Sequence, residues 1–497
     1  MRSIAGAGER GPIVSAAVVV SALMVLTLTV PAGLPALEVS MLVMLVAVSA
    51  VAYRSMLRWR VLLAAVILVI LLIPIKRYSL PGSLPFELEP YRLLVGVIVL
   101  LWIVALLVDP RVRLRLSGFE GPVLLILVGV VGSVLANGER ISKLAVDAEV
   151  TKGLTFFFSF WLVVYLIVSV VRQFEVVEFL IKVMVVGAAF VAFFSLIEAR
   201  SGFNIFDHLS TVMPFLALGE AVDGGTRGGA VRASGSAQGS IPLGAALALL
   251  LPVSAYLASR VSPRWWFAVA LIALGALGSR SRTAIVMILV LVLVFLWLRP
   301  KQTRRFILPA LVPAVVVIHF ALPGVMGTMR ASFFPEGGLI AQQSENPGAR
   351  GSGRVADLGP ALDEWSQQPV LGQGYSTRIT GRENPNAQIL DDQWLKTLLE
   401  TGLVGAIGWL WLLIAFIRRT GRHAKRDLSD YGWLLGAICA SVLAFAVGMV
   451  FYDAFSFIQV TFLFYILLGL GAALLKLPEG QRSRDAEPRR KPSPAAA

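Results

Sequence analysis

The stretch "GALGSRSRTAIVMILVLVLVF", Gly275 to Phe295, places two arginines, Arg280 and Arg282, between apolar segments. Apolar runs of this kind form helices in the hydrocarbon core of a membrane. The whole chain shares this character, because 57% of its 497 residues are hydrophobic and only 15% are charged. A soluble domain carries roughly a quarter charged residues. The sequence therefore predicts an integral membrane protein.

Apolar runs that can cross about 30 Å of hydrocarbon as helices recur along almost the whole chain. We expect an all-α, polytopic transmembrane helical bundle with about 12–14 spans, some of them shorter than the usual ~20 residues. The expected spans lie near residues 13–30, 38–53, 61–75, 93–108, 122–136, 153–172, 177–197, 241–258, 265–279, 284–298, 307–322, 394–417, 433–452 and 457–475. The first run lacks a small-residue cleavage site, so we expect a retained anchor there and not a signal peptide.

Basic residues mark one side of this bundle. Lys and Arg number 44 against 30 Asp and Glu, and most of the basic charge falls in alternate connections between the expected spans. These connections hold Arg54, Arg58 and Arg60; Arg111, Arg113 and Arg115; Arg260 and Arg264; Arg299, Lys301, Arg304 and Arg305; and Arg418, Arg419, Arg422, Lys425 and Arg426. Positively charged loops stay in the cytoplasm, so we expect both termini there and a basic charge that serves topology and not nucleic-acid binding.

Two long segments fall on the opposite, extracytoplasmic side, and loops of such length are usually functional. The segment 198–240 is rich in Gly and Ser and is expected to be a flexible approach to the next span. The segment 323–393 is expected to hold a short helix near 356–367, followed by a Gly-rich turn. The expected organisation is N-terminal transmembrane helices (1–197), a Gly-rich extracytoplasmic loop (198–240), transmembrane helices with an arginine cluster (241–322), a large extracytoplasmic loop (323–393), C-terminal transmembrane helices (394–475) and a disordered basic cytoplasmic tail (476–497).

Arg280 and Arg282 lie on the extracytoplasmic side, where the topology rule gives no reason for them. Arg232 precedes the span near 241 on the same side. A guanidinium group binds phosphate oxygens two at a time, and more strongly where water is scarce. We therefore expect these arginines to bind an anionic lipid head group such as a diphosphate. For each arginine taken alone, the competing interpretation is a side chain that extends from an apolar helix to the interface.

The remaining candidate ligands for a metal or cofactor are few. The single cysteine, Cys439, lies inside an expected span, and His208, His319 and His423 are scattered along the chain. Neither residue type has the spacing of a metal site. We expect no metal and no cofactor.

Four features follow one another in the second half of the chain. They are "VRASGSAQGSIPLGAALALLLP", "SRTAIVMILVLVLVF", a long outer loop that ends in "PVLGQGYS", and "LDDQWLKTLLETGLVGAIGWLWLL". Together, over residues 230–415, they resemble the O-antigen ligase and Wzy-type polysaccharide polymerase superfamily. Its members are membrane glycosyltransferases of the C-type helical fold, so the resemblance implies that fold and that activity.

The resemblance also implies roles for individual arginines. Family members hold the diphosphate of an undecaprenyl-linked glycan with an arginine ahead of the Pro-bearing span and with the arginine of the "SR" pair. These positions match Arg232 and Arg282. Arg354, ahead of the short loop helix, matches a further basic position of the family, and Arg280 adds a guanidinium group that the family pattern does not include.

The family commonly has His-Asn where this chain has Asp391 and Asp392. That histidine is the family's proposed general base, so the resemblance makes Asp391 the candidate base here. A carboxylate can take this role when burial raises its pKa toward neutrality. Asp392, Lys396 and Glu400 are spaced four residues apart and would share one face of the re-entering helix, where they could form ion pairs with one another. Both uses of this segment stay open.

The expected function is that of a membrane glycosyltransferase that polymerises or ligates undecaprenyl-diphosphate-linked glycans at the outer face of the bacterial cytoplasmic membrane. Its partners would be the polyprenyl-diphosphate-linked glycan donor, a glycan or lipid acceptor and the lipid bilayer. One alternative is a transporter of an anionic lipid or solute, which would favour charges at the bilayer midplane and halves related by a repeat. A second is a scaffold without activity. The sequence leaves open polymerase or ligase, the sugar and the acceptor.

Overall fold

A computed structural model describes residues 58–80, 89–109, 112–219, 225–227, 229–334, 338, 355–378 and 390–482. The described part is mainly helical. Its strands form two short antiparallel ladders: β1 (Tyr78–Ser79) pairs with β2 (Ala217–Leu218), and β3 (Thr226–Arg227) pairs with β4 (Ala230–Val231). The expected all-α, polytopic fold is confirmed.

Each expected span from residue 61 onward corresponds to a helix. These helices are α3 (Trp59–Leu72), α4 (Pro90–Val108), α5 (Glu120–Ala136), α7 (Asp147–Val170), α8 (Phe174–Ser201), α10 (Ser240–Tyr256), α11 (Trp265–Gly278), α12 (Arg282–Leu298), α13 (Pro300–Ala321), α17 (Gln393–Arg426), α18 (Asp430–Gly448) and α19 (Ile458–Leu475). The expected spans near 13–30 and 38–53 lie outside the described residues.

Short elements join these helices. They are α6 (Gly138–Lys143), η1 (Ile205–His208), α9 (Leu209–Val212), η2 (Leu257–Val261), α14 (Val325–Phe333), α16 (Leu358–Gln367), η3 (Ala454–Ser456) and η4 (Glu479–Gln481). The helix expected near 356–367 is α16.

Within the described part of the chain, seven helices are long and apolar enough to cross a membrane, or eight if the bent pair Val315–Ala321 and Val325–Phe333 is one broken span. Four further apolar helices, α3, α5, α11 and α12, are shorter. A helix of 17 residues such as α12 extends about 25 Å, because each residue adds 1.5 Å. The protein is therefore a multi-pass membrane protein, and the crossing of the shorter helices stays a prediction.

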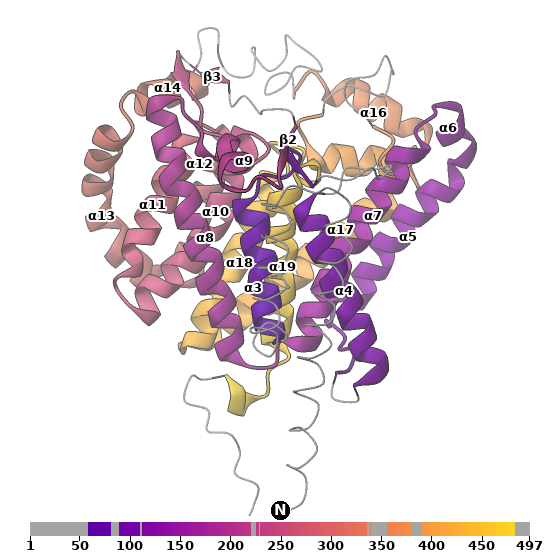
Figure 1. Ribbon diagram of the computed structural model, residues 1–497, viewed down its shortest axis with the longest axis horizontal. Helices are drawn as coiled ribbons and strands as arrows, with labels where there is room; N and C mark the ends of the chain where they lie inside the picture. Colours follow the sequence, from indigo (N-terminus) through magenta and orange to yellow (C-terminus); the bar gives the residue numbers. More distant parts are fainter. Residues whose placement is uncertain are drawn as a thin grey trace, which may run out of the picture.

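The core of the bundle lies around α10, α18 and α19, which are the most buried of the candidate spans. Figure 1 shows α18 and α19 in the middle, with α8 and α10–α13 on one flank and α4, α5 and α7 on the other. Small residues let some helices approach closely: a Cβ atom on Gly129 of α5 would lie 2.7 Å from the Cα atom of Gly405 of α17. Such contacts replace hydrophobic burial as the source of helix packing in lipid.

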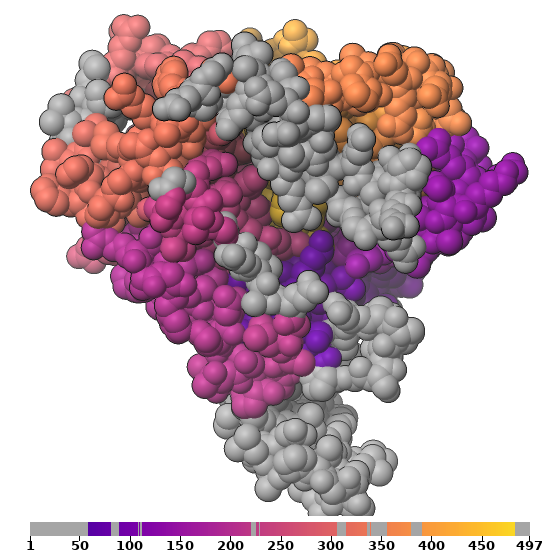
Figure 2. Space-filling model, turned by 90° about the horizontal axis from the view of Figure 1, so that it is seen from above, coloured from indigo at the N-terminus to yellow at the C-terminus, as the bar shows by residue number. Residues whose placement is uncertain are grey.

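The two long segments gather at one end of this bundle. Figure 1 places α9, β2 and β3 of the first segment, and α14 and α16 of the second, at the upper end. The C-terminal end of the described residues lies at the lower end. Figure 2 shows the upper end from above, where the orange residues around α16 lie beside the purple residues of α5 and α6. We call this the loop end of the bundle.

Candidate functional site

The turn between α11 and α12 carries Arg280 and Arg282 at the loop end. Arg280 adopts a left-handed backbone conformation, with φ 49°, which is rare for a residue other than glycine. Its side chain is only 3% exposed, and its guanidinium group donates to the carbonyl oxygen of Val231 in β4. Arg227 of β3 donates in turn to the carbonyl oxygen of Arg280, at 2.8 Å. These two bonds hold the β3–β4 hairpin against the turn. Arg280 therefore has a structural role in joining the two.

Arg232 directly follows β4 and reaches the same turn. Its Nε atom donates to the carbonyl oxygen of Ser279 at 3.4 Å. Loss of hydration on burial, and then the positive charge of Arg282, lower the pKa of Arg232. The buried Nη2 atom of Arg232 has no hydrogen-bond partner among the described residues. The structure thus brings Arg232, Arg280 and Arg282 together, and it holds two of their charges close to each other.

The Gly-rich approach to α10 is held by buried charges. The carboxylate of Glu198 accepts hydrogen bonds from the backbone nitrogens of Ser234 and Gly235, both within 2.9 Å. Arg77, which is fully buried, donates to the carbonyl oxygens of Gly235 and Ala237 and pairs with Asp207. The expectation of a flexible approach is therefore wrong for residues 233–239. The cause is the long-range pairing with Arg77 and Glu198, which no local sequence pattern reveals.

The start of α17 holds the two aspartates. Asp392 is the N-cap, and its carboxylate accepts from the backbone nitrogens of Trp394 and Leu395 at 2.8 and 3.1 Å. This geometry satisfies amides that the first turn of a helix leaves unpaired. Asp391 precedes the cap and is half-buried. Arg354 lies outside the described residues.

The ion-pair partner of Lys396 comes from outside α17 and not from the helix face that the spacing allowed. Lys396 Nζ pairs with Asp453, at 2.8 Å from Oδ2, and donates to Ser456 Oγ at 3.0 Å. Asp392 is engaged as a helix cap, and Glu400 keeps a buried Oε1 atom without a hydrogen-bond partner among the described residues. Asp453 could not be predicted as a partner of Lys396. It lies between two spans in "FYDAFS", where no periodic spacing links it to α17.

The connection between α18 and α19, residues 449–457, joins the arginines to the start of α17. On one side, Thr283 Oγ1, next to Arg282, lies 3.5 Å from the carbonyl oxygen of Phe451. On the other side, the backbone nitrogen of Gln393 donates to Met449, and Gln393 Oε1 accepts from the backbone nitrogen of Phe455, both at 2.8 Å. One short connection therefore contacts Thr283, the neighbour of Arg282, and also Gln393 and Lys396 near the start of α17.

A break in α17 anchors the second long segment. Gly402 has φ 63° and ψ −162°, which is not helical. The backbone nitrogens of Leu403 and Val404 donate to the carbonyl oxygens of Pro369 and Val370, at 2.9 and 3.2 Å. Gly372, with φ 67°, lies so close to α17 that an added Cβ atom would be 2.6 Å from the carbonyl oxygen of Leu399. The Gly-rich turn thus lets the backbone of the loop pack directly against the backbone of α17. This packing places Glu400 beside the loop.

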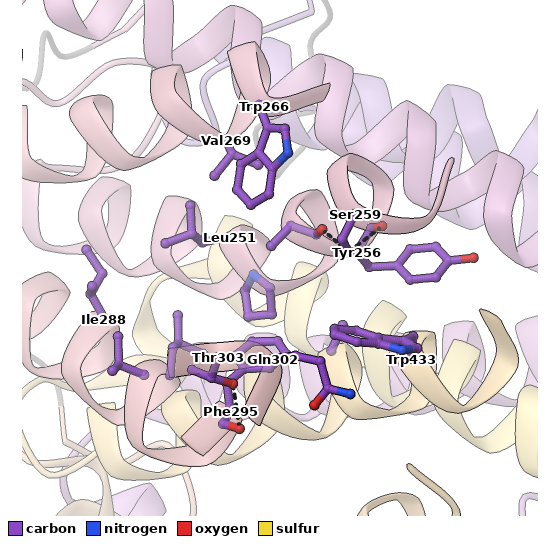
Figure 3. Close-up of a pocket in the computed structure, with 15 residues that line it drawn as sticks. Leu251, Tyr256, Ser259, Trp266, Val269, Ile288, Phe295, Gln302, Thr303 and Trp433 are labelled. Atoms are coloured by element: carbon purple, nitrogen blue, oxygen red, sulfur yellow. Dashed lines mark hydrogen bonds between the residues drawn. The ribbon is translucent and has the colours of Figure 1, made fainter. Parts of the chain in front are cut away.

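Two cavities flank these elements. A polar cavity of about 260 Å³ lies between α7, α17 and the turn at 375–378. An apolar cavity of about 240 Å³ lies between α10, α11, α12 and α18, and Figure 3 shows Leu251, Ile288 and Phe295 around it. It follows α12 away from Arg282. Among the described residues, no three His, Cys, Asp or Glu side chains gather as they would around a metal ion.

Comparison with known proteins finds a match for one segment of the chain. Residues 267–410 match the family model described as O-antigen ligase, a segment that includes Arg280, Arg282, Asp391 and the break in α17. No curated protein matches the sequence. The order of the motifs and the family match agree, and residues 267–410 are therefore similar to the O-antigen ligase family.

Proposed function

We propose that the protein is a membrane glycosyltransferase that polymerises or ligates undecaprenyl-diphosphate-linked glycans at the outer face of the bacterial cytoplasmic membrane. The O-antigen ligase match and the apolar helices support the broader class, a membrane protein of polysaccharide ligation. The observation that carries the finer proposal is that Arg232 and Arg280 bond around the turn that precedes Arg282 at the loop end, where the charge of Arg282 acts on Arg232. Two like charges held together in a partly dry site favour a ligand with two or more negative charges.

The proposed reaction uses the residues around the 449–457 connection. A hydroxyl oxygen of the acceptor attacks the anomeric carbon of the donor glycan, and the bond from that carbon to the diphosphate oxygen breaks. The hydroxyl proton passes to the carboxylate of Asp391. The lipid diphosphate leaves with an additional negative charge, which Arg232 and Arg282 stabilise. Arg280 positions Arg232 through β4, and Arg354 is proposed as a further cation for the diphosphate.

The apolar cavity suits the tail of such a donor. It is lined by Ile288, Leu291 and Phe295 of α12, the helix that Arg282 opens. Ile288 is about 9 Å from Arg282 along the helix axis, because each residue rises 1.5 Å. A lipid with its diphosphate at the arginines could therefore lay its polyprenyl chain along α12 into this cavity.

Replacing Arg282 by Lys tests the proposal. The charge remains, but the planar, two-pronged donor is lost, so glycan transfer by the purified full-length protein should fall by tenfold or more, on the order of the loss expected for a bidentate contact. The measurement is transfer from a polyprenyl-diphosphate-linked glycan. Arg330→Lys, at an exposed position of α14, is the matched control and should keep the original rate. Equal rates for both variants would contradict the diphosphate site.

A further inference from the structure

The polar cavity is separate from the arginine cluster. Its lining includes six charged side chains, Lys76, Lys152, Arg378, Lys396, Glu149 and Glu400, and it includes none of Arg232, Arg280 and Arg282. Ser456, which lies in the 449–457 connection and donates to Asp453, also lines it. Gln393, two residues beyond Asp391, lines it as well. The cavity thus reaches the start of α17, where Gln393 is two residues from the candidate base in the sequence.

Two of the four cations in this cavity are already paired within the protein. Lys396 binds Asp453, and Arg378 binds Glu364. Lys76 and Lys152, in contrast, are exposed residues at the edge of the cavity, and their ammonium groups have no hydrogen-bond or ion-pair partner among the described residues. Loss of hydration, and then the positive charge of Lys152, lower the pKa of Lys76, whereas the carboxylates of Glu89 and Asp453 partly offset this effect. An anion bound between them would relieve this repulsion.

Glu400 supplies a hydrogen-bond acceptor deeper in the cavity. Its side chain is only 4% exposed, and its Oε1 atom has no hydrogen-bond partner among the described residues. A buried polar atom without a partner costs about 1–3 kcal/mol, so such atoms in native proteins usually have a ligand or water to bind. Ser133 fixes the backbone here, because its hydroxyl donates to the carbonyl oxygen of Glu400. The carboxylate is thus held where a hydroxyl group of a ligand could donate to it.

The remaining wall of the cavity is aromatic. Phe157 and Tyr375 pack edge to face, with ring centroids 5.9 Å apart, and both line the space together with Trp409. Pockets for small ligands combine apolar walls of this kind with a few polar groups that set the orientation. A pyranose ring has hydroxyl donors at its edge and apolar C–H groups on its faces, so it fits this mixture. A simple inorganic anion would contact only the ammonium groups of Lys76 and Lys152 and would make no use of the aromatic wall.

We propose that this cavity binds an acidic sugar of the acceptor glycan, with its anionic group between Lys76 and Lys152 and one of its hydroxyl groups donating to Glu400. The anionic group can be a carboxylate or a phosphate substituent, since both offer oxygen acceptors to ammonium groups. The inference rests on the proposed function in taking the ligand to be the acceptor. Binding itself requires neither the donor nor transfer.

The test is direct binding to the full-length protein in lipid nanodiscs, without donor. The probes are the methyl glycoside of glucuronic acid, the matching methyl glucoside and inorganic phosphate, followed by saturation-transfer NMR and calorimetry. The acidic sugar should bind at least tenfold more tightly than the neutral one, and Lys152→Gln should weaken it by about tenfold, the effect of losing one charged contact. Lys143→Gln is the matched control, because Lys143 is exposed on α6 and pairs with Glu139 away from the cavity.

The contribution of Glu400 separates a sugar site from a simple anion site. Glu400→Gln should weaken the glucuronide by several-fold and leave phosphate binding unchanged. Phosphate that binds as tightly as the glucuronide, equal binding of both glycosides, or a Lys152→Gln variant with unaltered binding would overturn the inference. Arg282→Lys should keep glucuronide binding while it loses transfer. A protein that binds the glucuronide but never transfers glycan would contradict the proposed function and support the cavity assignment.

Discussion

Asp391 and Asp392 are neighbours in the chain, but the structure gives them different environments. Asp392 caps α17 through two backbone nitrogens, whereas Asp391 lies one residue outside the cap. Asn is as good an N-cap as Asp, because its side-chain oxygen accepts the same bonds. An amide cannot accept a proton from an acceptor hydroxyl, however. The same substitution at the two positions therefore distinguishes capping from base chemistry.

We expect Asp391→Asn to lower glycan transfer by ~10²-fold or more, as the loss of a general base does. Asp392→Asn should transfer at nearly the original rate and unfold at nearly the original temperature. Both variants are measured with the purified protein and a lipid-diphosphate donor. If Asp391→Asn transfers as fast as the original protein, Asp391 is not the base, and charge stabilisation by the arginines is the main catalytic device.

Gly402 is the residue at which the outer loop and α17 meet. Its φ of 63° and the carbonyl group of Val370 leave no room for a Cβ atom. We expect Gly402→Ala to destabilise the protein by ~2 kcal/mol or more, through backbone strain and displacement of the loop. Thermal unfolding in detergent measures this. Gly96→Ala in α4 is the control, because nothing lies within 4 Å of its added Cβ atom. Similar unfolding temperatures for both variants would show that the contact at Gly402 contributes nothing to stability.

At the scale of elements, the apolar runs were sufficient to predict the helices. Every expected span from residue 61 onward is a helix, because a bilayer requires all backbone groups of a span to pair within it. The end of a helix was predictable only to a few residues: α17 was expected to end near 417 and continues to Arg426. The break at Gly402 was not predicted, because its partners lie about thirty residues earlier in the loop.

The site was less predictable than the helices. The arginines of one turn were visible in the sequence, since they oppose the charge pattern of the loops. Arg77, Glu198 and Asp453 were not, because each acts through a partner more than fifty residues away or through backbone atoms of a loop. The pairing of Lys396 illustrates the reason. The spacing suggested Asp392 as the partner of Lys396. In the structure Asp392 caps α17, and Lys396 pairs with Asp453 of the 449–457 connection.

The apolar cavity along α12 gives a prediction about the donor. Ile288 lines the cavity, whereas the next residue, Leu289, is exposed on the outside of the helix. Ile288→Phe should fill part of the cavity and raise the KM for a donor with a long polyprenyl chain several-fold, with little effect on a donor with a short prenyl chain. Leu289→Phe makes the same change at a position outside the cavity and should alter neither KM. If Ile288→Phe affects both donors equally, the cavity does not hold the tail.

At the scale of the whole molecule, the grouping of the long segments at one end predicts the orientation in the membrane. In a Cys439→Ala background, Ser366→Cys on α16 should react with an impermeant maleimide in intact cells. Arg422→Cys near the end of α17 should react only after the membrane is permeabilised. Both positions are exposed, and Cys439 itself is buried. Labelling of position 422 in intact cells would contradict the expected topology and the proposed location of the reaction at the outer face.

The break in α17 also bears on how the protein is made. Leu403 and Val404 would expose unpaired backbone nitrogens to lipid at the moment of insertion, and each such group costs several kcal/mol in hydrocarbon. Their partners, Pro369 and Val370, come earlier in the chain. They have therefore left the ribosome, and in the expected topology have been exported, before α17 emerges. In the expected topology, the outer loop therefore supplies the carbonyl groups that complete the backbone hydrogen bonds of α17 at its break.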